Sequence, residues 1–240
     1  MSLDVIVVAA LSFALELKAL GTSTPVVVAT TPGFVPNGLA QSLQHPGGNF
    51  TGIDELPPGL TAKRLRLLTT AAPHVRKVAL LSTTPGSVSH GIQLADAEGE
   101  ASRLGVVVRA YRASSRPELG QALAAIAAER MEGLVNFQGG LSLSNRELII
   151  DFAKRYRLPA IYQSKLFVES GGLIALSPNQ EEQFRTAVRY ADQIVRGAKP
   201  GDLPIQYPGR YYLSVNLGAA TAIGLQLPQE VLRKADFVFH

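Results

Sequence analysis

Hydroxyl and amide side chains follow several of the apolar runs that the sequence predicts to be strands. Such groups donate and accept hydrogen bonds without ionising at neutral pH, so they suit the orientation of a small polar ligand better than acid–base chemistry. Two aromatic rings among them can cover an apolar part of that ligand. The candidate ligand-binding residues are Ser12, Thr30, Thr31 and Phe34 early in the chain, and Ser82, Thr83, Gln138, Tyr162 and Gln163 later.

No catalytic or metal-binding constellation accompanies these residues. The histidines are His45, His74, His90 and His240, and none stands at metal-ligand spacing or pairs by spacing with a serine nucleophile. We expect them at the surface, His90 least so because it lies near a predicted strand end. Glu169 is the one loop acid where charge could matter, and it has no partner acid. The chain has no cysteine and no nucleotide-binding or nucleophile-elbow motif, so we expect no enzyme, metal or cofactor.

The composition is that of a globular protein with a substantial core. The chain has 240 residues, of which 46% are hydrophobic, enough for one large domain or two small ones. The net charge is +4 and the basic residues are spread out, so nucleic acid is not an expected partner. No apolar run approaches the ~20 residues that cross a bilayer. The start at Met1 runs directly into a predicted strand, and we expect any signal segment to lie outside this chain.

Continuous Val- and Ile-rich runs alternate with segments of helical spacing. Continuous hydrophobicity indicates parallel strands buried on both faces, and the alternation predicts a doubly wound α/β sheet with right-handed crossovers. Ligands of such sheets bind beyond the carboxyl ends of the strands, where the candidate residues stand. Strands are predicted at 5–9, 26–29, 78–81, 106–108, 134–137 and 160–162, and helices at 13–20, 60–72, 88–104, 117–129, 145–157 and 181–195.

Local signals mark several helix ends. Capping-box spacing predicts helix starts at Ser115 and Ser144, and Asn179 offers a related cap. Gly105 and Gly197 follow helical patterns and predict helix ends.

The stretch from Pro46 to Ile53 predicts a tight turn followed by a short strand that leaves one folded unit for another. Two strand–helix pairs precede Ile53 and about four follow it. Two pairs make a poor independent core, so we expect the first unit to borrow the helix at 181–195. We also expect it to expose a sheet edge through which two copies form a homodimer.

Five ordered motifs resemble those of substrate-binding proteins of ABC transporters in the tryptophan/tyrosine-uptake-like group. They extend over nearly the whole chain. The motifs are G-L-x-x-S-L-x-x-P-G-G-N-x-T-G at 38–52, K-R-L-x-L-L at 63–68, L-P-A-I-Y with F-V-E-x-G-G at 158–172, G-A-K-P-x-D-L-P at 197–204, and a closing segment at 216–228.

The resemblance implies a type I periplasmic-binding fold, with two Rossmann-like lobes of parallel sheets joined by three crossovers near Ile53, 173–177 and 205–213. The first lobe would comprise 1–53 and 177–205, and the second 54–176 and 206–240. Similar proteins begin with a signal or lipoprotein peptide and two further strand–helix units, so the first lobe is expected to be truncated at its N-terminus. They also carry an Asp-Pro pair where this chain has Gly33 and Phe34. This chain therefore lacks the acid that could pair with the ammonium group of a ligand.

The implied function is the solute-binding component of an ABC importer, which captures a small organic ligand, such as an amino acid or a related molecule, by hinge closure. The implied partners are ABC permease subunits, and the implied location is periplasmic or extracytoplasmic and membrane-anchored. Two alternatives remain open. One is the effector domain of a transcription regulator, which needs an upstream DNA-binding segment. The other is a small α/β isomerase or racemase, for which the sequence offers no acid–base pair.

Overall fold

The structure is a computed structural model that describes residues 3–240, and it divides into two compact units. Unit 1 comprises the described residues up to Pro57 together with Pro178–Tyr211, and unit 2 comprises Pro58–Ser177 and Tyr212–His240. The chain therefore crosses from one unit to the other three times.

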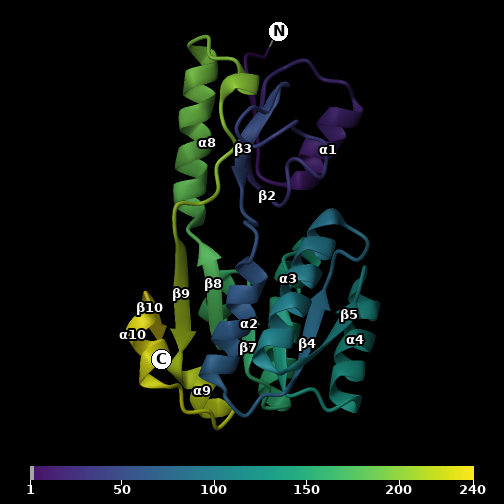
Figure 1. Cartoon of the computed structure of the whole chain (residues 1–240), viewed down its shortest axis with the longest axis vertical. Helices are drawn as coiled ribbons and strands as arrows, with labels where there is room; N and C mark the ends of the chain where they lie inside the picture. Colours follow the sequence, from purple (N-terminus) through teal and green to yellow (C-terminus); the bar gives the residue numbers. More distant parts are fainter. Residues whose placement is uncertain (1–2) are drawn as a thin grey trace. The chain divides into compact units, whose positions relative to one another are not determined.

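Unit 1 is a parallel three-stranded sheet with a helix on each face (Figure 1). Successive strand residues point to opposite faces, so Val26 and Val28 pack in one cluster with Ala14 of α1, while Val27 packs in another with Ala187 of α8. The continuous apolar run of β2 is thereby explained. The strand order is β1-β2-β3, and the elements are β1 (Ile6–Val8), α1 (Leu11–Ala19), β2 (Val26–Thr31), β3 (Phe50–Asp54), α8 (Gln180–Val195) and the short 3-10 helix η1 (Pro200–Asp202).

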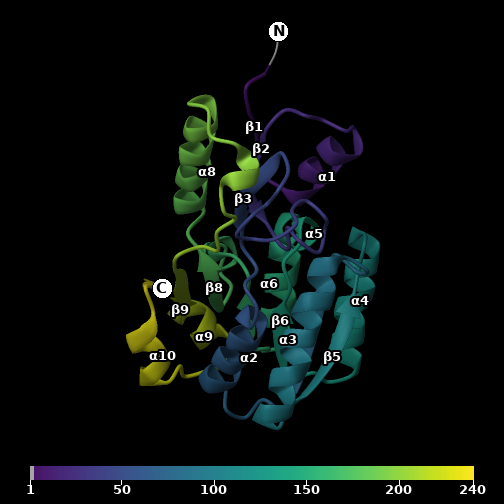
Figure 2. The ribbon, with the colours of Figure 1, turned by 45° about the horizontal axis from the view of Figure 1, so that its top comes forward.

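Unit 2 is built on a seven-stranded sheet of order β10-β9-β8-β7-β6-β4-β5. Its C-terminal elements, yellow in Figures 1 and 2, lie beside β9 in both views. The strands are β4 (Lys77–Ser82), β5 (Val107–Arg112), β6 (Gly133–Asn136), β7 (Ala160–Tyr162), β8 (Ile174–Pro178), β9 (Tyr211–Asn216) and β10 (Phe237–Phe239). The helices are α2 (Leu60–Ala71), α3 (Val88–Leu104), α4 (Arg116–Ala128), α5 (Gly140–Ser144), α6 (Arg146–Arg155), α7 (Lys165–Glu169), α9 (Leu217–Ala222) and α10 (Gln229–Lys234).

Helices cover both faces of the central strands of unit 2. Val78 and Leu80 of β4 pack in a cluster with α2, α3, α9 and α10, whereas Ala79 and Leu81 pack in a cluster with α4, α6 and α7. All four side chains are fully buried. The α/β architecture with parallel strands that the alternation of patterns predicts is confirmed.

The predicted helix ends are confirmed with one exception. The side chains of Ser115 and Asn179 accept N-terminal N–H groups of α4 and α8, and Gly105 ends α3 with a φ of 64°. The prediction for Ser144 is wrong, because the chain is already helical in α5 when it reaches this residue. The Ser144 hydroxyl donates back to the carbonyl of Gly140 and does not cap α6.

The glycine at position 52 is required by the close approach of two strands in unit 1. Gly52 has a φ of 145°, and a Cβ added there would lie 2.0 Å from the carbonyl oxygen of Val28. The register between β2 and β3 shifts between Val28 and Thr31, so the glycine stands at an irregularity of the ladder. Asn49, just before β3, donates its side-chain amide to the carbonyls of Thr22 and Thr24. The conspicuous turn and strand of the sequence thus fix the β2–β3 pairing.

We expect Gly52→Ala to lower the free energy of unfolding of unit 1 by about 3 kcal/mol or more, since the new methyl group overlaps backbone that cannot move freely. Gly48→Ala is the matched control, because an added Cβ there meets nothing within 4 Å, and it should change stability by less than about 0.5 kcal/mol. Urea unfolding followed by circular dichroism measures both. Equal effects of the two substitutions would contradict this account.

Candidate functional site

The carboxyl ends of three neighbouring strands in unit 2 form an edge of neutral polar groups. Ser82 ends β4, Asn136 ends β6 and Tyr162 ends β7, and the residues that follow these strands belong to the same edge. Because β4 pairs with β6 and β6 with β7 in parallel, the three ends meet on one side of the sheet. The edge therefore contains the predicted residues Thr83 and Gln163 close together. We call it the polar edge of unit 2.

A buried hydrogen-bond network connects these residues. The amide of Asn136 donates to Oε1 of Gln163 at 2.6 Å, and Nε2 of Gln163 donates to Oγ of Ser142 at 3.3 Å. The backbone N–H of Ser142 donates to Oγ1 of Thr83, also at 3.3 Å. Each of the four side chains is less than a tenth exposed. Buried amides and hydroxyls that hold one another in this way are fixed in orientation before any ligand arrives.

A second set of contacts attaches α3 to the same edge. Nδ1 of His90 lies 2.8 Å from Oγ of Ser82, and Oε1 of Gln93 accepts the backbone N–H of Gln138 at 2.9 Å. The expectation of a surface histidine is wrong for His90, which is 6% exposed because the start of α3 packs against the end of β4. Burial, and then the positive charge of Arg112, lower the pKa of His90. The ring is accordingly neutral at pH 7, like the rest of the edge.

The Ser82–His90 pair is not arranged for nucleophilic catalysis. The Ser82 side chain has no exposed surface, so its oxygen cannot reach a substrate. That oxygen also accepts the backbone N–H of Thr84 at 3.4 Å, and within residues 3–240 no carboxylate hydrogen-bonds to His90 to orient its ring. This pair was not predicted from the sequence, because the two residues are eight positions apart and a loop separates them.

Two atoms of the polar edge have no hydrogen-bond partner among the described residues. They are Oδ1 of Asn136 and Oγ1 of Thr84, both buried. An unpaired buried carbonyl oxygen is an acceptor for an N–H or ammonium group, and its desolvation costs stability until a partner is present. The predicted residue Gln138 is half-buried beside them. Asn136, Ser142 and Gln93 were not predicted from the sequence. Asn136 lies inside the strand predicted at 134–137, whereas the observed strand β6 already ends at this residue.

The two predicted aromatic residues lie in hydrophobic cores. Tyr162 is 1% exposed and stacks on Phe167, with ring centroids 4.5 Å apart and planes 12° apart. Burial raises the pKa of the Tyr162 hydroxyl. Phe34 has no exposed surface and packs in the core of unit 1 with Leu39 and Phe50. Both rings support the loops around them, and either would have to leave its core to contact a ligand.

The predicted hydroxyls of unit 1 follow β1 and β2. Ser12 is exposed in the first turn of α1, Thr30 donates its hydroxyl to the carbonyl of Ala9, and the buried Oγ1 of Thr31 has no partner among residues 3–240. This bond from the Thr30 hydroxyl to the backbone of Ala9 joins the ends of β1 and β2. These three residues thus share one end of the unit 1 sheet.

A buried carboxylate, which sequence reasoning missed, holds the loop after β2. Asp54 accepts the backbone N–H groups of Gly33, Phe34 and Leu56 at 3.0, 3.1 and 3.1 Å. Burial raises the pKa of Asp54, and these three donors oppose that shift by stabilising the charged form. The residue is 3% exposed, so it positions the loop and is not open to a solute.

Two further classes of site were sought in the described part of the chain. Residues 3–240 contain no group of three His, Cys, Asp or Glu side chains that could hold a metal ion. No helix in this range is both long and apolar enough to cross a membrane.

The comparisons with known proteins identify the family. The model of the family "ABC transporter substrate binding protein" matches residues 1–239, and the chain belongs to this family. A curated relative, the tyrosine-binding protein of Clostridioides difficile (strain R20291), is 23% identical over 202 residues, which are 84% of this chain. The chain spans 57% of the length of that relative.

Solved structures share the fold over nearly the whole chain. An ABC domain from Streptococcus pneumonia in complex with L-Trp has a TM-score of 0.91 and 21% identity, and the match covers 98% of this chain and 79% of that one. A conserved domain protein from Vibrio cholerae has a TM-score of 0.90 and 24% identity, with coverages of 99% and 79%. The type I periplasmic-binding architecture is therefore confirmed.

We expect Asn136→Ala to destabilise unit 2 by about 1–3 kcal/mol, because it leaves the amide of Gln163 buried without its donor. Ser144→Ala on α5 is the matched control, since that exposed hydroxyl bonds to carbonyls of its own helix and to the amide of Asn145, outside the buried network. Thermal unfolding of both variants checks the prediction. An Asn136→Ala protein as stable as the control would show that the network carries no stability.

Proposed function

We propose that this chain is the solute-binding component of an ABC importer and that the polar edge of unit 2 recognises the solute. The supporting observation is a pre-oriented set of buried amides and hydroxyls with an unpaired acceptor at Asn136. Such a site can bind a polar group through neutral side chains that carry out no acid–base reaction, as a transport receptor requires. Family membership over residues 1–239 supports the same function. No bond is made or broken in this proposal.

The proposed solute is an amino acid with an aromatic side chain or a closely related molecule. Relatives described as a tyrosine-binding protein and as a complex with L-Trp support this class. The unpaired Oδ1 of Asn136 is a suitable acceptor for an ammonium group, and the amide of Gln138 can bond to the solute carboxylate. Tyr162 packs beneath the end of β7 in unit 2, and Phe34 packs in the core beneath the loop after β2 in unit 1.

Both lobes take part in the proposed capture, with the first at 1–53 and 177–205 and the second at 54–176 and 206–240. Thr83, Gln138 and Gln163 act from the second lobe, where Ser82 positions the edge through its contact with His90. Ser12, Thr30 and Thr31 act from the first lobe. A ligand shifts such a hinge toward closure only by the free energy of the contacts that it makes in the closed state alone.

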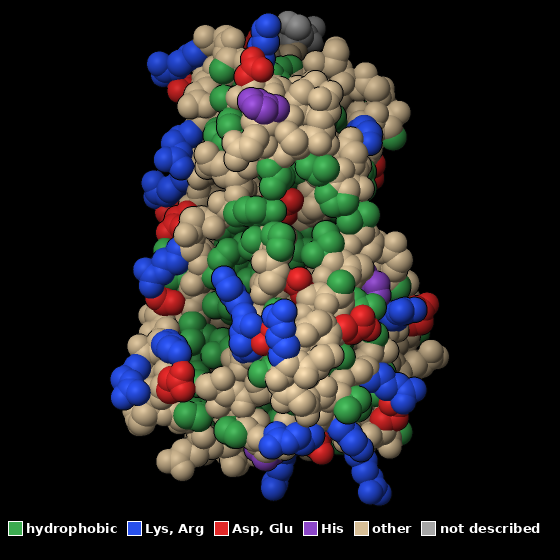
Figure 3. Space-filling model, viewed as in Figure 1, with side chains coloured by type: hydrophobic (Ala, Val, Ile, Leu, Met, Phe, Trp, Pro, Cys, Tyr) green, Lys and Arg blue, Asp and Glu red, His purple; other side chains and the backbone are tan. Residues whose placement is uncertain are grey.

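The proposed setting is extracytoplasmic, with ABC permease subunits as partners. Nucleic acid is not a proposed partner: on the face drawn in Figure 3, Lys and Arg side chains are interspersed with Asp and Glu, which does not favour a polyanion.

Isothermal titration of this chain with L-tryptophan and L-tyrosine tests the proposal, with glucose as a solute of another class. We expect saturable binding of at least one amino acid. Gln138→Ala should weaken it about tenfold by removing a hydrogen bond to the solute. Gln121→Ala, an exposed glutamine in the middle of α4, should leave it unchanged. If neither amino acid binds, or if both variants behave alike, the proposed site is wrong.

We also propose that two copies associate through the free edge of β1. This strand pairs only with β2 among the described strands, and Val7 at its centre is 45% exposed. Unpaired N–H and C=O groups beside exposed valine make the edge a template for another strand.

Sedimentation velocity at micromolar concentration should show a dimer that Val7→Lys converts to monomer, because a charge on the edge opposes strand pairing. Val107→Lys is the control, placed on the other unit's edge strand β5, where Val107 is 66% exposed. A monomeric parent protein, or a dimer that survives Val7→Lys, would rule out this association.

A further inference from the structure

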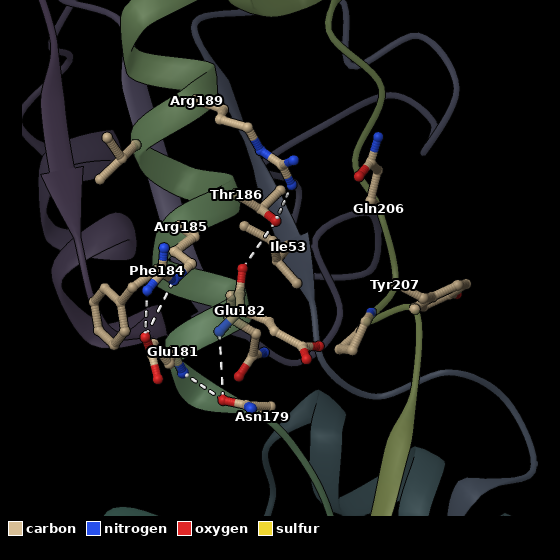
Figure 4. A pocket seen from close by; sticks show the side chains of 14 residues that line it. Ile53, Asn179, Glu181, Glu182, Phe184, Arg185, Thr186, Arg189, Gln206 and Tyr207 are labelled. Carbon is tan, nitrogen blue, oxygen red and sulfur yellow. Dashed lines mark hydrogen bonds and ion pairs between the residues drawn. The ribbon is translucent and has the colours of Figure 1, made fainter.

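A groove separate from the polar edge of unit 2 runs along the first half of α8, wholly within unit 1. Its volume is about 950 Å³, within the range of small-molecule sites. Figure 4 shows Thr186, Arg189 and Glu182 on α8 facing the segment that carries Gln206 and Tyr207, with Ile53 of β3 between them. We call this feature the α8 groove.

The α8 groove contains a buried amide that has no partner. Both Oε1 and Nε2 of Gln183 are buried without a hydrogen bond among the described residues, and the side chain is only 2% exposed. The same side chain lines the groove. A buried primary amide left unpaired costs free energy for both its donor and its acceptor. Its natural complement is a group that presents an acceptor and a donor side by side, such as another amide.

An arginine six residues farther along α8, Arg189, supplies a positive charge. Arg189 donates through Nη2 to Oγ1 of Thr186 at 2.8 Å, which holds its guanidinium beside Thr186 on the side of the groove (Figure 4). No carboxylate of residues 3–240 lies within ion-pair distance of Arg189, whereas its neighbour Arg185 is paired with Glu181 at 2.6 Å. A guanidinium with free N–H groups is the preferred partner of a carboxylate.

The spacing of these groups defines the ligand. Thr186 is three residues from Gln183, about 4.5 Å along the helix axis, so the guanidinium held at Thr186 stands about one turn from the unpaired amide. An amide and a carboxylate separated by a single carbon match this arrangement. The apolar wall of Ile53, Pro208 and the Tyr207 ring can cover a hydrocarbon chain.

From this geometry we infer that the α8 groove binds an N-acyl amino acid, whose amide pairs with Gln183 and whose carboxylate pairs with Arg189. The acyl chain lies on the apolar wall. This ligand differs from a free amino acid in that its nitrogen is a neutral donor and its adjoining carbonyl is an acceptor, so it satisfies both atoms of Gln183 together.

The test is calorimetric titration with N-hexanoylglycine. Two comparison compounds test the two contacts separately. N-hexanoylglycinamide lacks the carboxylate proposed to pair with Arg189, and octanoate lacks the amide proposed to pair with Gln183. We expect N-hexanoylglycine to bind in saturable fashion and each comparison compound to bind about tenfold more weakly. Absence of saturable binding of N-hexanoylglycine overturns the inference.

Three variants assign the contacts. Gln183→Leu and Arg189→Gln should each weaken binding about tenfold. Arg196→Gln should have no effect, because this exposed arginine lies at the C-terminal end of α8, outside the groove, and pairs with Asp192. Gln183→Leu should also raise the melting temperature of the free protein, since it removes an unpaired buried amide. Unchanged binding in Arg189→Gln, or a melting temperature lowered by Gln183→Leu, contradicts the assignment.

Discussion

The hydrogen bond between the amides of Asn136 and Gln163 is the constraint on which the polar edge of unit 2 depends. Burying two amides beside each other costs free energy unless they are hydrogen-bonded, and here the NH₂ group of Asn136 donates to Oε1 of Gln163 at 2.6 Å. Among the described residues, Oδ1 of Asn136 is left without a partner. Ser142 then joins Gln163 to Thr83, so one network fixes groups from three parts of the chain. Neutral groups held in this way can recognise a solute without reorganising around a charge.

The rest of the unit 2 fold positions those strand ends. Sheet residues such as Leu80 and Leu81 bury their side chains on opposite faces, which leaves the carboxyl edge as the place where polar groups meet. The loop after β6 approaches Thr83 so closely that a Cβ at Gly139 would lie 2.3 Å from its hydroxyl oxygen. In unit 1, Asp54 gathers the loop after β2 in a comparable way, with a carboxylate in place of amides.

Sequence patterns predicted the parallel strands and long helices because continuous Val-rich runs and helical spacing depend only on local residues. They missed β8, which was expected only as a crossover near 173–177. They also missed β9 and β10, because Tyr211–Asn216 mixes polar and aromatic residues and Phe237–Phe239 has only three residues. The candidate residues Thr83 and Gln163 were found from their places after strands. Ser142 and Gln93 were not, since they reach the edge from helices whose orientation is set by tertiary packing. The sequence likewise does not predict that the amide of Gln183 is buried without a partner, because in the sequence Gln183 is only one of several polar residues on an amphipathic helix.

We propose the polar edge of unit 2 as the place where this ABC transporter substrate-binding protein receives its solute. Side-chain amide signals report on it directly, because Asn136, Gln138 and Gln163 each carry an NH₂ group visible in nitrogen-15 NMR spectra. Titration with L-tryptophan should shift the three pairs of signals in a common saturable curve while the amide of Gln121 stays in place. Shifts confined to other residues, with these three unchanged, would contradict the claim.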